Sequence, residues 1–266
     1  MTDYKASKRI IGTSSERGEP YTEDMSNTDD WAFADTGAIN VTSGSLSYNI
    51  QRNGSNDCAT YDFGSTISGT KFLLRFSHTP TAQSHSSGSN CIGFFGLSST
   101  TGGQNSNQDF IGFNFASNDT DGATTKNDTT LVANSVTGQA SNSHTSGTKY
   151  YEIKRNSATE VVFTVYNNSD FTGVYRTQTE DELSSSITGL RYFKVANWHA
   201  SGSGSANFTG TMDNLQLWDN ATSPASNNYQ TNSIWEETDT GKHFLWTGSA
   251  WTEVAWSVSN IPPRRC

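Results

Sequence analysis

Carboxylates are the first side chains to consider as catalysts, because hydrolysis of a glycosidic bond needs two of them on either side of the sugar. The densest acidic clusters are Glu180-Asp181-Glu182 and Glu236-Glu237. Their members are adjacent in turn-like surroundings, whereas a catalytic pair on one strand needs a spacing that points both side chains to one face. We interpret both clusters as solvated surface groups and predict no catalytic residue among them.

The histidines and serines offer no other catalytic arrangement. The five histidines, none of which is paired at a spacing suited to metal binding or to a catalytic triad, are His78, His85, His144, His199 and His243. The sequence also lacks a G-x-S-x-G nucleophile elbow. We therefore predict isolated core or surface histidines and a protein that is not an enzyme.

One segment has the composition of a metal site. Asn118-Asp119-Thr120-Asp121-Gly122 is followed closely by Asn127-Asp128, and carboxylates at alternate positions can point into one loop. Ca²⁺ prefers such oxygen ligands, although the spacing and the closing glutamate of an EF-hand are absent. We predict Asp119, Asp121 and Asp128 as the ligands if Ca²⁺ binds, with an ordinary Asx-rich turn as the alternative and no other cofactor.

Carbohydrate binding requires an aromatic ring on which a sugar can stack, with polar groups beside it. Trp198-His199 lies at the end of a predicted strand, Tyr192 to Trp198, and just before the Gly-Ser loop Ser201 to Ser205. An aromatic side chain can be exposed at such a place. We predict a carbohydrate-binding site at Trp198 and His199, with packing of Trp198 in the core as the alternative.

The segment Ile234 to Val254 is rich in tryptophan and has two turn-like stretches, Asp239-Thr240-Gly241 and Thr247-Gly248-Ser249. This pattern predicts a small three-stranded β-meander with one aromatic face. Its large aromatic side chains are too many for so small a unit to bury against itself, and a contiguous apolar patch usually meets a partner. We predict that the meander serves assembly, with a structural clip for the C-terminus as the alternative. The assembly residues would be Trp235, Phe244, Trp246, Trp251 and Trp256.

The elements that position these residues are predicted to be strands. The chain has 266 residues, of which 16% are charged and 12% aromatic, and it is rich in Ser, Thr, Asn and Gly. This composition favours pleated strands joined by polar loops over helices. No segment shows a sustained helical period, and the best helical candidate is only the short acidic piece Thr179 to Leu183. All-β sandwiches of this size commonly form one domain with small additions.

Short runs of apolar residues recur at regular spacing from Trp31 onward, separated by Gly-Ser-Thr clusters. The last of them, Phe208 to Asn220, changes phase, because Phe208 and Met212 share one face whereas Leu215 and Leu217 share the other. A one-residue bulge near Asp213 and Asn214 would keep all of them in the core. The other predicted strands are Ile39 to Gln51, Cys58 to Phe63, Phe72 to Phe76, Cys91 to Leu97, Asp109 to Phe115 and the hairpin Tyr150 to Tyr166.

Three segments of the chain carry a family resemblance. The final strand reads F-x-G-x-M-D-x-L-x-L-W from Phe208, a Y-x-I-x-R and V-x-F-x-V-Y hairpin precedes it, and Trp31, Val41, Gly44 and Leu46 open the domain. Their order resembles the concanavalin A-like, laminin-G-like jelly roll over Trp31 to Asn220. The resemblance implies an all-β, antiparallel jelly-roll β-sandwich, and such domains often hold calcium near the rim of the sandwich.

Two enzyme families of this fold have characteristic strand motifs. Tyr192-Phe193-Lys194-Val195-Ala196 is similar to the Y-F-K-A-G strand of alginate-lyase jelly rolls, but their R-x-E-x-R and Q-[IV]-H strands are missing. The E-x-D-x-x-E strand of jelly-roll glucanases is missing as well. The resemblance therefore supports a polysaccharide lyase only as a minor alternative.

The two ends of the chain resemble parts of viral proteins. The Trp-rich meander resembles short modules at the ends of tail, fibre and capsid-surface proteins of tailed phages, and the D-Y-K-A-x-K-R-I-x-G-T start looks like the leading segments of marine-virus structural proteins. Tag-like disordered ends are the alternative for the start. We predict an extended N-terminal arm (1–24), the sandwich (25–221), a linker (222–233), the meander (234–257) and a tail (258–266).

Charge, leader and cysteines limit the partners and the location. The formal net charge of −9 leaves no basic surface for a nucleic acid. Met1 to Tyr21 has no apolar signal-peptide core, and no run of eighteen apolar residues occurs, so neither export by a signal peptide nor membrane insertion is expected. Cys58, Cys91 and Cys266 fit no metal spacing; we predict that Cys58 and Cys91 are buried thiols, with a Cys58–Cys91 disulfide as the alternative.

Together these features predict a non-enzymatic structural or surface protein of a virion, assembled in the host cytoplasm. The lectin-like sandwich would serve particle assembly or decoration and glycan attachment. Its expected partners are further copies of itself, other virion proteins and surface glycans. The alternative is a secreted or cell-surface carbohydrate-binding module whose signal peptide has been removed.

Overall fold

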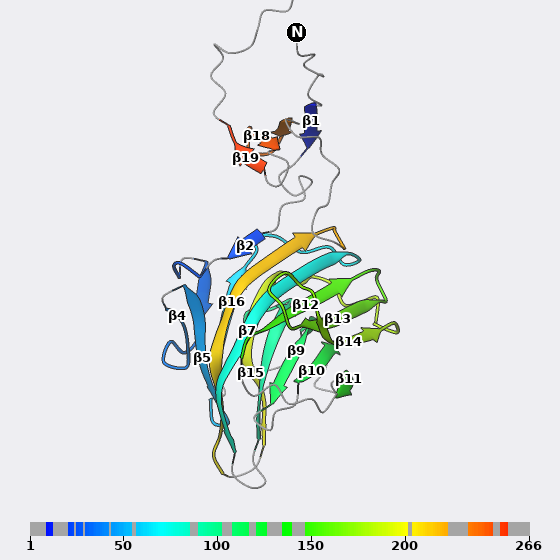
Figure 1. Ribbon diagram of the computed structural model, residues 1–266. Coiled ribbons are helices and arrows are strands. Elements are labelled where there is room, and N and C mark those ends of the chain that lie inside the picture. Colours follow the sequence, from blue (N-terminus) through cyan, green and yellow to red (C-terminus); the bar gives the residue numbers. More distant parts are fainter. Residues whose placement is uncertain are drawn as a thin grey trace, which may run out of the picture. The chain divides into compact units, whose positions relative to one another are not determined.

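The computed structural model describes residues 9–12, 21–23, 25–28, 30–42, 44–54, 57–85, 90–102, 108–116, 121–126, 135–139, 147–201, 204–222, 234–246 and 251–254. The chain divides into two compact units, which are described separately below. The larger unit is Pro20–Thr222, and the smaller one combines Met1–Glu19 with Ser223–Cys266. All regular secondary structure in the described residues is β-strand (Figure 1).

The larger unit is built from two antiparallel sheets, as Figure 1 shows. The seven-stranded sheet has, in spatial order, β11 (Ser135–Gln139), β10 (Asp121–Lys126), β9 (Phe110–Ala116), β8 (Asn90–Ser98), β15 (Tyr192–Ser201), β6 (Cys58–Asp62) and β3 (Trp31–Phe33). The eight-stranded sheet has β14 (Val174–Glu180), β13 (Val161–Tyr166), β12 (Lys149–Arg155), β7 (Phe72–His85), β16 (Ala206–Asp219), β5 (Ser45–Gln51) and β4 (Ile39–Thr42), with β2 (Tyr21–Glu23) paired to the end of β16. The predicted all-β, antiparallel jelly-roll β-sandwich is confirmed.

The core lies between the two sheets and is mainly aromatic. Phe113 of the seven-stranded sheet packs edge-to-face on Tyr151 of the eight-stranded sheet, with ring centroids 5.0 Å apart. Phe76, from β7, stacks on the same Tyr151 at 5.3 Å and meets Phe193 of β15 edge-to-face at 5.5 Å. Such alternation of inward aromatic residues on both sheets is what buries one face of each strand.

The predicted bulge in the last strand is confirmed. The pairing of β16 with β7 shifts register between Asp213 and Gln216, and Asn214 takes a left-handed backbone conformation with φ of 56°. Met212, Leu215 and Leu217 are all fully buried as a result. The bulge therefore reconciles the change of phase in the sequence with a single core.

The short helical candidate does not form a helix. Thr179 and Glu180 are the last two residues of β14, and residues 181–183 follow in an irregular segment. Acidic residues in succession carry no apolar face that a helix could bury, so the neighbouring strand determines the local structure.

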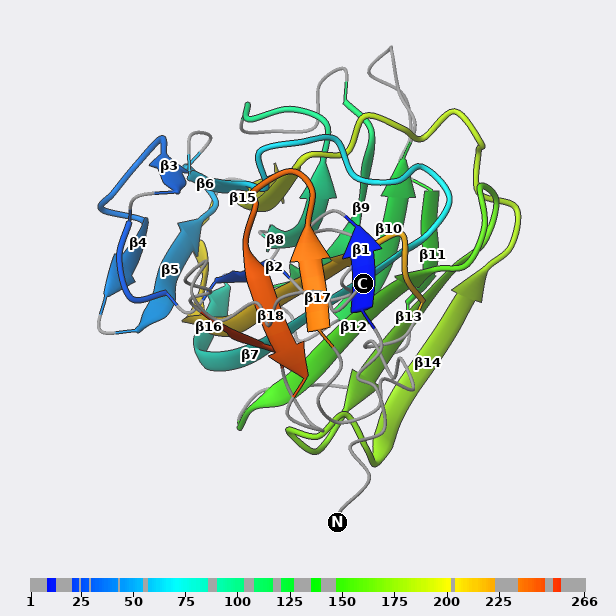
Figure 2. The same ribbon diagram turned by 90° about the horizontal axis from the view of Figure 1, so that it is seen from above.

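The smaller unit is a four-stranded sheet with the order β1 (Arg9–Gly12), β17 (Ile234–Glu237), β18 (His243–Trp246) and β19 (Trp251–Glu253). The predicted meander supplies the last three strands. β1 pairs in parallel with β17, from Arg9 opposite Ile234 to Gly12 opposite Glu237, and Figure 2 shows the two strands side by side. Part of the predicted N-terminal arm is thus a strand of this sheet, and the sandwich is inserted in the chain between β1 and β17.

No helix in the described part of the chain is long and apolar enough to cross a membrane.

Candidate functional site

A polar pocket of about 260 Å³ lies at the end of the sandwich where β5 and β7 finish and β16 begins. This is the end of β16 farthest from its pairing with β2 (Figure 1). Three side-chain amides, two hydroxyls and one guanidinium line it, and the full lining is Gln51, Arg52, Asn53, Ser84, Gly204, Ser205, Ala206 and Asn207. Amides and hydroxyls both donate and accept hydrogen bonds, which suits a ligand with many hydroxyl groups.

Hydrogen bonds join the segments that line the pocket. The backbone N–H of Arg52 donates to the carbonyl of Ala206 at 2.9 Å, and its Nε donates to the carbonyl of Gly204. The Ser84 hydroxyl donates to Oδ1 of Asn207 on the neighbouring strand. The lining is thereby held as one structure instead of three independent loops.

The loop that carries Arg52 and Asn53 is also fixed from inside the sandwich by Asn197. This residue is fully buried, and its Nδ2 donates to the carbonyls of Gln51 at 2.7 Å and Gly54 at 3.0 Å. Because Asn197 belongs to β15 of the opposite sheet, it ties the pocket wall to the core. A wall fixed in this way loses little conformational freedom when a ligand binds.

Asp57 completes the support of that loop. Its Oδ2 accepts the backbone N–H of Gln51 at 2.9 Å, and burial raises the pKa of its carboxyl group, with a smaller contribution from Asp35. A Cβ atom on Gly54 would lie 1.9 Å from the same oxygen. Position 54 therefore needs glycine so that the carboxylate can pack against the backbone.

The predicted carbohydrate-binding residues lie next to this support. The register of β15 against β8 shifts between Asn197 and His199, which makes Trp198 the extra residue of a β-bulge. Bulges often change the direction of a side chain near a binding site. The side chains of Trp198 and His199 lie outside the described part of the structure, so their role as an aromatic platform stays a prediction.

A second polar cluster surrounds Lys194, in the strand that is similar to Y-F-K-A-G. Phe193 and Val195 point into the core, so Lys194 lies on the other face of the seven-stranded sheet, which we call the outer face. Lys194 is fully buried there, and its Nζ donates to Oε1 of Gln108 and to the carbonyl of Gly102, both at 2.6 Å. Burial lowers the pKa of Lys194 to about 8.

The same oxygen of Gln108 accepts two more hydrogen bonds. Ser98 Oγ donates to it at 2.7 Å and Thr100 Oγ1 at 2.8 Å, whereas Nε2 of Gln108 has no partner among the described residues. The network fastens the connection between β8 and β9 to β15. Because Lys194 has no solvent exposure, a polymeric substrate could not reach its amine, and we assign it a structural role.

Cys58 lies close to this network as a free, buried thiol. Its Sγ donates to the carbonyl of Thr101 at 3.7 Å, and burial raises its pKa while the nearby charge of Lys194 lowers it. A buried thiol is what the sequence predicted for this position. The side chain of Cys91 lies outside the described residues.

The predicted calcium ligands are not brought together in the described part of the chain. Asp119 and Asp128 lie outside it, and Asp121 begins β10 opposite Phe115, with its side chain not described. No group of three or more His, Cys, Asp or Glu in the described residues could hold a metal ion. Calcium binding in this loop stays a prediction.

The aromatic residues of the smaller unit divide into two groups. Trp235 and Phe244 are paired across β17 and β18 and are only 4% and 8% exposed, so they belong to its interior and not to an open patch. Trp246 pairs with Trp251 across β18 and β19. The side chains of that pair, and the whole of Trp256, lie outside the described residues, and the assembly prediction now depends on these three.

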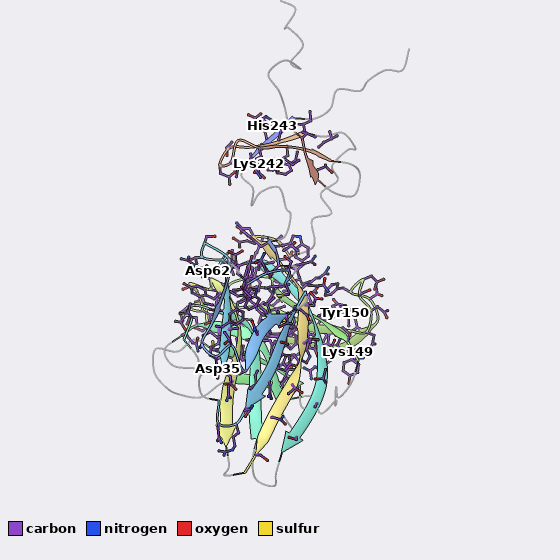
Figure 3. All side chains as sticks on the ribbon, turned by 90° about the vertical axis from the view of Figure 1, so that its left-hand side faces the viewer. Asp35, Asp62, Lys149, Tyr150, Lys242 and His243 are labelled. Atoms are coloured by element: carbon purple, nitrogen blue, oxygen red, sulfur yellow. The ribbon has the colours of Figure 1, made fainter. Side chains whose placement is uncertain are left out.

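Two of the histidines can be placed. His78 is buried in the core, where its Nε2 meets the hydroxyl of Tyr48. His243 lies beside Lys242 at the start of β18 (Figure 3). Its Nε2 is 3.8 Å from Glu236, and Lys242 forms an ion pair of 3.1 Å with Glu253. These contacts agree with the structural roles predicted for the histidines.

An ion pair covered by aromatic rings on the eight-stranded sheet has no signal in the sequence. Arg75 pairs with Glu152 at 2.6 Å, and its guanidinium lies 4.0 Å from the centroid of Phe171. The ring of Phe171 also meets the ring of Tyr150, which is labelled in Figure 3, edge-to-face with their centroids 6.0 Å apart. Phe171 has φ of 58°, a strained conformation for a bulky residue. The contacts with its neighbours hold it in that conformation.

The pocket itself could not be identified from the sequence. Its lining comes from two short stretches, 51–53 and 204–207, and the single residue Ser84, and none of them has a distinctive sequence. Strand pairing in the sheet brings them together. The Gly-Ser loop Ser201 to Ser205, which the sequence analysis placed beside the predicted carbohydrate-binding residues, does contribute Gly204 and Ser205 to the lining.

Comparisons with known proteins show only distant likeness. No protein-family model matches the sequence, and no curated protein matches it. Solved structures with a similar arrangement include the CBM2 module of the evolved Dit of Lactobacillus casei BL23 phage J-1, with 12% identity and a TM-score of 0.47 over 76% of this chain and 96% of that one. Peanut lectin has 13% identity and a TM-score of 0.47 over 74% and 97%. A prokaryotic β-1,3-1,4-glucanase from a mouse hindgut metagenome has 11% identity and a TM-score of 0.49 over 75% and 98%.

Proposed function

We propose that this protein is a non-enzymatic glycan-binding protein that binds its ligand in the pocket at the end of the sandwich. The observation that carries the proposal is the lining of amides, hydroxyls and one guanidinium, held rigid by Asn197 and Asp57. A sugar presents many hydroxyl groups, each of which can donate and accept. Fixed polar groups around a concave site supply the matching partners.

The proposal of binding without catalysis rests on the same lining. Amides and hydroxyls do not titrate near neutral pH, so they are poor general acids and bases. Glycoside hydrolysis would need two carboxyl groups about 5–9.5 Å apart across the sugar. The described lining residues include no carboxylate and no histidine.

We further propose that the smaller unit attaches the sandwich to a virion or a similar particle. Its four-stranded sheet joins β1, which precedes the sandwich in the chain, to β17, β18 and β19, which follow it, so the whole sandwich is inserted between two adjacent strands of the sheet. Within the sandwich, the pocket lies at the end of β16 farthest from β2, the strand at which the chain enters this unit. Trp246, Trp251 and Trp256 are the residues proposed to contact the neighbouring subunit or virion protein.

Glycan binding can be tested by applying the full-length protein to a glycan array. We expect binding to a defined group of glycans, and a loss of at least tenfold in affinity in the double variant Asn53→Ala/Asn207→Ala. Asn168→Ala is the matched control, because Asn168 is an exposed amide in the β13–β14 loop, bonded to Thr172. If the double variant binds as well as the control, the pocket is not the site.

The particle role needs a separate measurement. The native protein should co-sediment with assembled particles from the cells that produce it, and deletion of Ser233–Cys266 should abolish this co-sedimentation.

The absence of catalysis is tested with the same glycans. Incubation of the bound glycans with the protein should release no new reducing ends or unsaturated products. Turnover of any of them would show that the protein is an enzyme.

A further inference from the structure

We infer that His78 makes the sandwich sensitive to acid: protonation of its ring loosens the last part of the β7–β16 ladder, on the side of the pocket. This switch would operate whatever the pocket binds, so it is independent of the proposed glycan binding. It follows from where the ring is buried, from the strands that it joins and from the way those strands are paired beyond it.

His78 occupies an inward position of β7 in an aromatic part of the core, where only 1% of its surface is exposed. Its ring centroid lies 4.2 Å from that of Phe115, 5.3 Å from that of Phe95 and 5.7 Å from those of Tyr151 and Phe208. These rings come from β9, β8, β12 and β16, so both sheets enclose the imidazole. A charge among apolar rings has lost the water that would stabilise it, which makes the protonated ring costly in the folded state.

The groups that face His78 from the described strands do not offset such a charge. Two are tyrosines, Tyr48 of β5 and Tyr151 of β12, and tyrosine hydroxyls stay neutral between pH 5 and 8. Lys149 lies opposite His78 on β12 and is itself a cation, with its Nζ 2.5 Å from Oδ1 of Asn167. The described residues of β8, β9 and β16 present only apolar side chains to the ring: Phe95, Phe115, Phe208 and Met212.

His78 also joins three strands. The hydroxyl of Tyr48, from β5, donates to Nε2 of His78 across Gly210 of β16, the strand between β5 and β7. Glycine allows this crossing, because a Cβ atom at position 210 would lie 2.3 Å from the Tyr48 hydroxyl oxygen. A neutral imidazole accepts the bond with its unprotonated nitrogen, whereas a protonated ring has donors on both nitrogens. Protonation therefore sets two donors against each other at this contact.

The pairing of β7 with β16 is interrupted directly beyond the histidine. Pro80, which has no N–H to donate, lies opposite Gly210, and the register shifts at the next residue of β16. Residues 82–85 and 206–209 therefore form a separate short ladder, and such a unit can open at lower cost than the whole sandwich. Phe208, which covers the histidine ring, belongs to this ladder. Its opening would let water reach the imidazole.

The direction of the pH dependence follows from linkage. The open state binds a proton that the closed state excludes, so the stability of the short ladder is present in full above about pH 6.5, the ordinary value for histidine, and is lost as the pH falls. Asp57 cannot cause this loss, because burial raises the pKa of its carboxyl group and its protonation therefore favours the folded state.

The test measures hydrogen exchange of the full-length protein by mass spectrometry at pH 7.5 and pH 5, corrected for the intrinsic effect of pH on exchange. We expect amides of 79–85 and 206–210 to exchange at least about fivefold faster at pH 5, within the limit of about thirtyfold that one excluded proton allows 1.5 pH units below the ordinary histidine value. Amides of β12 and β13 should keep their protection. Equal acceleration in all strands, or none in the short ladder, would overturn the inference.

His78→Gln separates titration from packing, because glutamine can accept the Tyr48 hydrogen bond and carries no charge at either pH. Its short ladder should no longer respond to acid, whereas the matched control His243→Gln, in the smaller unit, should respond like the wild type. An unchanged response in His78→Gln would mean that another group senses the acid, and the inference would be wrong. If His78→Gln does not fold, the exchange pattern of the wild type decides.

Discussion

Lys194 is a residue whose burial should be visible in the pH dependence of stability. Its pKa is lowered to about 8 in the folded protein, mainly by burial, from an ordinary value of 10.5. Between these pH values the unfolded chain binds more protons than the folded one, so this residue makes the free energy of unfolding rise with pH. Below about pH 8 the cost of burying the charge is present in full.

We predict that Lys194→Met removes this rise. Between about pH 8 and 10.5, the free energy of unfolding of the protein with Lys194 should rise relative to that of the Lys194→Met variant. The slope of this difference should be at most about 1.4 kcal/mol per pH unit, the value for one proton. Urea unfolding at several pH values measures it. Both proteins should carry Cys58→Ala, so that this buried thiol, whose pKa is also shifted, does not contribute to the pH dependence. Parallel stability curves would show that Lys194 titrates as a solvated lysine.

Gln108 should tolerate, and gain from, a carboxylate. Its Oε1 receives three hydrogen bonds, one of them from the ammonium of Lys194, while its Nε2 has no partner in the described structure. Charge-assisted hydrogen bonds are roughly twice as strong as neutral ones. We predict that Gln108→Glu stabilises the protein by about 1–2 kcal/mol at pH 7, and that Gln108→Met, which accepts none of these bonds, destabilises it. Urea unfolding checks both, and a loss of stability in Gln108→Glu contradicts the prediction.

Among the strands, the bulge in β16 depends on one backbone conformation. Asn214 has φ of 56°, which costs a residue with a Cβ atom about 1–2 kcal/mol, although asparagine tolerates it better than most. We predict that Asn214→Gly changes stability by only a few tenths of a kcal/mol, while Asn214→Ala loses about 1 kcal/mol. Thermal unfolding of the pair distinguishes them. Equal losses would mean that the asparagine side chain, and not the backbone, matters here.

The strands could be predicted wherever they bury one face for several residues. Alternation of Leu46, Tyr48 and Ile50 gives β5, and the change of phase before Leu215 gives the bulge in β16. β1 and β2 could not be predicted, because segments of four and three residues have too few positions to show a period. Their structure depends on the strands with which they pair.

The candidate site was less predictable than the fold. Strand pairing follows from local patterns, but the pocket depends on contacts between residues far apart in the sequence, such as Asn197 with Gln51 and Gly54. Nothing in a single sequence distinguishes the asparagine that supports this wall from the many exposed asparagines of the chain. The burial of Trp235 and Phe244 was unpredictable for a related reason, because an aromatic side chain on a short strand looks the same in the sequence whether it is covered or exposed.

At the scale of the whole molecule, the sandwich should fold without the smaller unit. Its core cluster draws every member from residues between Met25 and Leu217. We predict that deletion of Ser233–Cys266 leaves the melting temperature of the sandwich within a few degrees of its original value, while it abolishes oligomerisation. Circular dichroism, calorimetry and light scattering measure the two effects. A truncated protein that still forms oligomers would mean that the smaller unit is only a terminal clip.

The insertion of the sandwich between β1 and β17 has a consequence for the order of folding. Tyr21 pairs with Leu217, so the two points where the chain enters and leaves the sandwich are neighbours. Once the sandwich has folded, the parallel pair of Arg9–Gly12 with Ile234–Glu237 has to close only the two connecting segments, and the entropy of loop closure grows only slowly with length. During synthesis, however, β1 leaves the ribosome before the sandwich and must wait for β17. A complete small sheet can form only after β17, β18 and β19 have been translated, so attachment through that sheet would exclude products that terminate before these strands.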